Sequence, residues 1–116
     1  MIDLDTEIPK EITEKTFEAV EIAKKTGKIK KGTNETTKTL ERGTAKLVVI
    51  AKDVNPKEII MHFPALCREK DIPFVPVDSR EELGTAAGLG IPTSAVSIIQ
   101  EGEAKDLIKE IVSKLK

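Results

Sequence analysis

The stretch Leu47-Val48-Val49-Ile50-Ala51 decides the fold, because it is a continuous apolar run of strand length. A strand with one solvent-exposed face alternates apolar and polar residues, whereas a strand covered on both faces is apolar throughout. We therefore predict a buried strand here, with other elements packed against both of its faces.

Helical and strand-like segments alternate along the rest of the chain, with short connections between them. Apolar residues at three- and four-residue spacing predict helices, and short apolar runs predict further strands. The predicted helices span residues 9–25, 33–42, 79–88 and 103–116, with short helices opening at Pro56 and Pro64; the predicted strands span 74–77 and 94–99, with a short further strand around Ile29. This alternation predicts one domain, residues 1–116, of the α/β class with a mixed and largely buried sheet.

The composition is that of a globular protein, with 39% apolar and 34% charged residues. No apolar run approaches the ~20 residues that span a bilayer. The acidic start of the chain does not resemble a signal peptide. Cys67 is the only cysteine, which excludes an internal disulfide and fits a reducing compartment. We expect a cytoplasmic protein with no membrane contact, and the abundance of Lys and Glu beside three amide side chains favours a thermophilic source.

Positive charge is concentrated in one part of the chain. The net charge is −1, yet residues 24–46 hold eight basic and only two acidic residues. Such asymmetry is typical of one confined anion-binding face. The structural alternative is a solvated basic loop.

The basic stretch also contains the strongest candidate binding motif, from Lys28 to Gly43. Gly32 and Thr33, both candidate RNA-binding residues, lead into a helix whose first amides lack helical partners and point outward, which favours anion binding. The helical spacing places four polar side chains on one face: Asn34, Glu35, Lys38 and Arg42. A carboxylate among cations suits contact with base edges, since guanine donates hydrogen bonds there. The structural alternative is ordinary capping, with Thr33 or Asn34 as the cap and the charges matching the helix dipole.

A second candidate is the loop between Gly84 and Ser94. It places Leu89 and Ile91 in a connection bounded by glycine and proline, where exposed apolar residues are costly. The loop lacks the sequence of a dinucleotide or phosphate-binding motif. Either the two side chains fold back onto the core or they form an apolar lip around an extruded base.

Three carboxylates form a third candidate, because Asp53, Asp78 and Glu101 each follow a predicted strand. Carboxylates at the carboxyl ends of parallel strands can hold Mg²⁺ for phosphoryl transfer or phosphate binding. Helix capping is the explanation we favour, and we predict no catalytic residue, metal site or cofactor. An enzyme would need the basic helix start beside these strand ends, whereas RNA binding favours the two lying apart. His62 and Cys67 have no partner at metal-ligand spacing, so we expect both to pack in the core.

These motifs resemble a known family. The runs Lys-Lys-Gly-Thr-Asn-Glu-Thr-Thr-Lys from residue 30, Glu-Arg-Gly from 41, Ala-Lys-Leu-Val-Val-Ile-Ala-Lys-Asp from 45 and Gly-Leu-Gly-Ile-Pro from 88 are similar to the archaeal large-subunit ribosomal proteins of the kink-turn-binding L-seven-Ae family. The resemblance covers nearly the whole chain. It implies a three-layer α/β/α sandwich around a mixed four-stranded sheet, with RNA binding and no enzymatic activity.

The resemblance also implies a role for each motif. A kink-turn is an RNA helix that bends sharply at a three-nucleotide bulge beside tandem sheared G·A pairs. Contacts to the guanines of these pairs are implied for Asn34, Glu35 and Lys38, and close approach of the backbone for Gly32. Phosphate contacts are implied for Lys31, Arg42 and Arg80. Enclosure of the extruded bulge nucleotide is implied for Ile59, Leu89, Gly90 and Ile91.

The implied RNA partners are ribosomal RNA of the large subunit, box C/D and H/ACA guide RNAs and ribonuclease P RNA, and the implied protein partners are those of guide ribonucleoproteins. The chain departs from the family at Gly90, where several archaeal relatives have a larger polar residue, and at Asn55, where some have Glu. A relative that only mediates protein contacts would lack Asn34, Glu35 or Lys38, and all three are present.

Overall fold

Four strands form one sheet in the computed structural model, which describes Leu4 and residues 6–115. They are β1 (Lys28–Lys31), β2 (Leu47–Ala51), β3 (Phe74–Val77) and β4 (Ala95–Gln100), in the order β1-β4-β2-β3. Strands β2 and β3 are parallel, while β4 is antiparallel to both β1 and β2. The predicted mixed sheet of four strands is confirmed, and Pro76 lies on an edge strand, where its missing N–H costs little.

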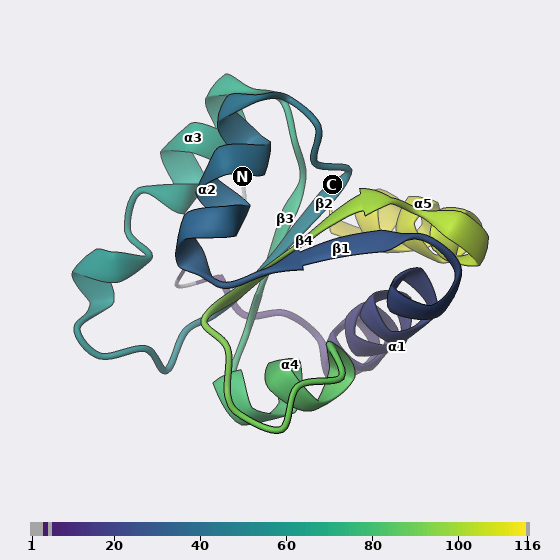
Figure 1. Cartoon of the computed structure of the whole chain (residues 1–116), viewed down its shortest axis with the longest axis horizontal. Coiled ribbons are helices and arrows are strands. Elements are labelled where there is room, and N and C mark those ends of the chain that lie inside the picture. The colour runs from purple at the N-terminus through teal and green to yellow at the C-terminus, as the bar shows by residue number, and fades with distance from the viewer. Residues whose placement is uncertain (1–3, 5, 116) are drawn as a thin grey trace.

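Helices cover both faces of this sheet. Figure 1 shows α2 (Thr33–Glu41) and α3 (Phe63–Glu69) on one side, and α1 (Lys10–Thr26), α4 (Arg80–Ala86) and α5 (Lys105–Leu115) on the other. The predicted three-layer α/β/α sandwich is therefore confirmed. Among the described helices, none is long and apolar enough to cross a membrane.

The core lies on both sides of β2. All five residues of β2 are buried, as the continuous apolar run predicted. The predicted stripe of α1 is also buried, and it consists of Ile12, Thr16, Ala19, Val20 and Ala23. Ile108 and Ile111 of α5 extend the core, while Leu107, Val112 and Leu115 pack at its margin. Burial of this apolar surface makes the sheet a rigid support for the loops at its ends.

Some boundaries differ from the prediction. The segment after Pro56 is a single 3₁₀ turn, η1 (Lys57–Ile59), and a second 3₁₀ turn, η2 (Gly102–Ala104), precedes α5. The residue predicted to end the last helix, Lys116, lies outside the described residues. The short strand expected around Ile29 is confirmed as β1, which pairs with β4.

We predict that Gly84→Ala destabilises the protein by about 1–3 kcal/mol, although alanine favours helices. A methyl group at Gly84 would meet the Ile91 carbonyl oxygen well inside van der Waals distance, so α4 and the following loop would have to separate. Gly90 has open space around it, and Gly90→Ala should change stability by no more than about 0.5 kcal/mol. Urea unfolding of both variants tests this, and equal effects would contradict the close packing of α4 on the loop.

Candidate nucleic-acid interface

The predicted binding residues lie on segments that meet at one end of the sheet. The Gly32 N–H donates to the Ala95 carbonyl at 2.8 Å, and the Ala51 N–H donates to the Ser94 carbonyl at 2.9 Å. Because β4 is antiparallel to its neighbours, its first residues lie beside the last residues of β1 and β2. The start of α2, the segment after β2 and the loop before β4 therefore converge at this end.

The start of α2 depends on Gly32, which has φ 96° and ψ 160°. Only glycine adopts this backbone region readily, and it turns the chain from β1 into the helix. The first helical hydrogen bond runs from the Thr36 N–H to the Gly32 carbonyl at 3.0 Å. The amides of residues 33–35 precede that bond and have no acceptor within the helix. The positive end of α2 is thus directed outward, as the sequence predicted.

No side chain caps α2 within the described part of the chain. The capping explanation predicted Thr33 or Asn34 in that role, and this was wrong. The Thr33 hydroxyl instead shares a hydrogen bond with the Ser94 hydroxyl, and Asn34 is exposed on the first turn. The Thr33 hydroxyl, which the local pattern assigned to the helix end, is therefore bonded to Ser94, a distant residue just before β4.

The outer face of α2 carries the predicted polar side chains. Asn34 and Lys38 are exposed, and Glu35 is half-buried. The Lys38 Nζ lies 3.5 Å from the Glu35 Oε1, and Arg42 is exposed just past the end of the helix. Exposed pairs of this kind contribute about 0–1 kcal/mol to stability, so both groups can exchange partners at little cost. Lys31 is exposed one residue before Gly32.

Arg80, the first residue of α4, is held by its backbone between two loops. Its N–H donates to the Asp53 Oδ1 at 2.9 Å, and its carbonyl accepts from the Thr93 N–H at 3.1 Å. Its side chain is exposed. Asp53 follows β2, and Thr93 lies just before β4, so Arg80 is placed at the same end of the sheet as Gly32.

The loop after α4 begins with a tight helix ending. The Leu89 N–H donates to the Gly84 carbonyl at 2.8 Å, and Gly88 has a positive φ of 77°. Leu89 is half-buried against the core, whereas Ile91 is 69% exposed. Leu89 therefore folds back onto the core, whereas Ile91 is free to form an apolar lip. Ile59 is also exposed, at 41%, on the segment between β2 and α3.

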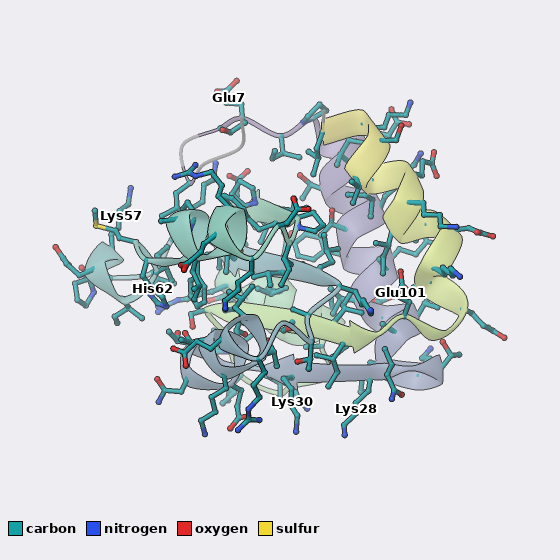
Figure 2. All side chains as sticks on the ribbon, turned by 90° about the horizontal axis from the view of Figure 1, so that it is seen from above. Glu7, Lys28, Lys30, Lys57, His62 and Glu101 are labelled. Carbon is teal, nitrogen blue, oxygen red and sulfur yellow. The ribbon has the colours of Figure 1, made fainter. Side chains whose placement is uncertain are left out.

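The three carboxylates are not gathered at one place. Asp53 accepts from the Arg80 N–H, and Asp78 pairs with Lys52 at 3.1 Å. Glu101 follows β4, which runs antiparallel to β2, so it lies at the other end of the sheet. Figure 2 shows Glu101 across the molecule from His62. The described residues contain no group of acidic, His or Cys side chains placed to hold a metal ion.

One expectation about these carboxylates was wrong. The basic start of α2 lies at the same end of the sheet as Asp53 and Asp78, where the phosphoryl-transfer hypothesis required it. Position alone does not favour catalysis, because Asp53 caps α4 and the third carboxylate is remote.

His62 and Cys67 have different environments, although both were expected in the core. Cys67 is buried, as predicted, and burial raises the pKa of its thiol to about 12, which keeps it unreactive. His62 is exposed, and that prediction was wrong. Its Nε2 lies 2.9 Å from the Thr37 Oγ1 of α2. Sequence spacing gave no signal for this pair, which is 25 residues apart.

A model of the ribosomal protein L7Ae/L30e/S12e/Gadd45 family matches residues 14–108. The chain is also similar to a solved structure from Giardia lamblia, a 15.5kD RNA binding protein, with 34% sequence identity and a TM-score of 0.90. The similarity covers 97% of this chain and 96% of that one.

We predict that Asp53→Ala lowers the free energy of unfolding by about 0.5–2 kcal/mol, the range for a lost helix cap. Asp78→Ala is the matched control, since Asp78 is 89% exposed and its surface ion pair contributes about 0–1 kcal/mol. Chemical unfolding of both variants measures the difference. A larger loss for Asp78→Ala would contradict a stabilising role for Asp53, which accepts from the first amide of α4 beside the Ser79 cap.

Proposed function

Because the chain belongs to the ribosomal protein L7Ae/L30e/S12e/Gadd45 family, we propose that it binds RNA and that the RNA element it recognises is a kink-turn. The observation that carries the proposal is the outer face of α2, where Glu35 and Lys38 lie side by side beyond an open helix start. The similar Giardia lamblia protein, which is an RNA binding protein by its title, supports the general function.

The chemistry of this face fits guanine better than phosphate alone. The Glu35 carboxylate repels phosphate, yet it can accept hydrogen bonds from the N–H groups on the Watson–Crick edge of guanine. Asn34 and Lys38 can donate to the acceptor atoms of the same bases. Sheared G·A pairs leave such guanine edges free, which supports them as the target. Gly32 carries no side chain to obstruct a base that approaches the helix start.

The surrounding loops fit the remainder of a kink-turn. Exposed apolar side chains at Ile59 and Ile91 can cover an extruded bulge base, with Leu89 and Gly90 between α4 and Ile91 completing the lip. Lys31, Arg42 and Arg80 are exposed cations around this area and can contact the phosphates of the bent strand. The protein then acts by holding RNA in a bent shape, and no step of catalysis is required.

The cellular targets that we propose are those implied by the resemblance of the sequence. They are ribosomal RNA of the large subunit, the box C/D and H/ACA guide RNAs and ribonuclease P RNA. Proteins of guide ribonucleoproteins are the proposed protein partners. All of these RNAs would be bound through the same element, so a single interface serves every assembly.

We predict that Glu35→Gln weakens binding to a minimal kink-turn by about 1–3 kcal/mol, because the variant loses the acceptor charge for guanine. Binding to the same RNA with its G·A pairs replaced by Watson–Crick pairs should stay level or rise slightly, since a repulsive carboxylate is removed. Gel-shift titrations of both RNAs measure the difference.

Glu41→Gln is the matched control for this experiment. It removes the same charge from the same exposed helix, three residues beyond Lys38. We expect it to leave the preference for intact G·A pairs unchanged. If Glu35→Gln binds the intact kink-turn as tightly as the wild type, or if the wild type does not distinguish the kink-turn from a straight duplex, the proposed function is wrong.

We also predict a moderate salt dependence of kink-turn binding. Few cations face the proposed site, so the slope of log affinity against log salt should correspond to about three to five phosphates at roughly 0.7–0.9 each. Arg42→Ala should reduce the slope by about one unit. Lys109→Ala, on α5 across the sheet, should leave it unchanged. A slope typical of about ten contacts would contradict a confined binding face.

A further inference from the structure

A hydrogen bond joins His62 to α2, the proposed RNA-binding helix. The other contact of Thr37 identifies which of the two groups is the donor. The Thr37 Oγ1 donates to the Thr33 carbonyl at 2.9 Å and also lies 2.9 Å from the His62 Nε2. A hydroxyl has one hydrogen, which the Thr33 carbonyl receives, so the imidazole must donate from Nε2. The neutral ring is therefore the Nε2–H tautomer. Its position is fixed further by Phe63, whose ring centre is 4.1 Å away.

The first turn of α2 is joined on its other side to β4. The Thr33 hydroxyl bonds to the Ser94 hydroxyl, and the Gly32 N–H bonds to the Ala95 carbonyl. A row of polar contacts thus runs from His62 through Thr37 and Thr33 to Ser94. It crosses the proposed RNA site from the start of α3 to the end of the loop that carries Ile91.

The segment between β2 and α3 is held at two points that both belong to this site. At its start, Asp53 is bonded to Arg80, and at its end His62 is bonded to Thr37. Figure 2 shows His62 and Lys57 on the same side of the molecule, where this segment lies outermost. Between the two points Ile60 is buried, but its neighbour Ile59 is exposed. Ile59 therefore lies three residues before the point at which His62 joins this segment to α2.

We propose that His62 and Thr37 are positioning residues for RNA binding: their hydrogen bond sets the separation between Ile59, which covers the extruded base, and the first turn of α2, which contacts the G·A pairs. The inference rests on the proposed function and assigns roles to two residues outside the contact surface. The two halves of the site are then prearranged before RNA arrives, and the bulge base does not have to order the segment itself.

The test uses Thr37→Val, which removes the hydroxyl and keeps the shape of the side chain, with Thr37→Ser as the matched control that retains it. Each variant is titrated with a kink-turn and with the same RNA lacking only the base of the extruded nucleotide. Thr37→Val should bind the complete kink-turn roughly two- to tenfold more weakly, the effect of one hydrogen bond. It should bind the abasic RNA as the wild type does, and Thr37→Ser should match the wild type on both.

His62 supplies a second, independent set of variants at an exposed position. His62→Leu removes the donor, whereas the amide nitrogen of His62→Gln can take the place of Nε2. We expect His62→Leu to reproduce the selective loss and His62→Gln to recover most of the affinity. The double variant Thr37→Val/His62→Leu should be no weaker than either single variant, because both remove the same bond.

Several outcomes would overturn the inference. Equal losses on complete and abasic RNA would indicate a general weakening of α2, and wild-type affinity in Thr37→Val and His62→Leu would show that the bond has no role. Nitrogen-15 spectra of the free protein must show neutral His62 protonated at Nε2, and protonation at Nδ1 would contradict the assignment. Failure of the wild type to prefer a kink-turn over a duplex would instead contradict the proposed function itself.

Discussion

The conformation of Gly32 is the constraint on which the binding face depends. Its φ of 96° and ψ of 160° lie in a region that only glycine adopts readily, and its N–H is bonded to the carbonyl of Ala95. Gly32 redirects the chain from the edge strand β1 into α2. Its hydrogen bond also holds the open start of that helix against the sheet. Without the turn, the amides of residues 33–35 and the side chains of Asn34 and Glu35 would not face the same space as the neighbouring loops.

The sheet topology explains why the neighbouring loops lie beside the start of α2. Strand β4 is inserted between β1 and β2 and runs antiparallel to both, so its beginning lies beside their ends. One end of the sheet therefore collects the start of α2, the segment after β2, the start of α4 and the loop before β4. The buried residues of β2 and α1 provide the stability, which leaves polar and apolar side chains at this end free for binding.

Much of this could be predicted from the sequence, because the informative patterns are local. The apolar run of β2, the helical stripe of α1 and Pro76 at a sheet edge follow from periodicity and backbone chemistry alone. The shared face of Asn34, Glu35 and Lys38 follows from helical spacing. Each prediction required only residues within a few turns of one another.

The features that the sequence did not reveal depend on partners far apart in the chain. Helix capping by Asp53 was expected, but the amide that it accepts from begins a helix 27 residues later, and His62 bonds to a threonine 25 residues earlier. Thr33 was assigned to the helix end because its partner Ser94 is 61 residues away. The direction of β4, which removes Glu101 from the other carboxylates, is likewise a property of pairing and not of composition.

The most direct measurement is a nuclear magnetic resonance titration of the isotopically labelled protein with a minimal kink-turn RNA. We predict that backbone amide shifts change in residues 31–42, 53–62, 78–80 and 88–94, with the largest changes in residues 32–35. Amides of α1 and α5, on the opposite layer, should stay unchanged. Changes centred on α1 or α5, or no change at RNA concentrations that saturate the gel shift, would contradict the account.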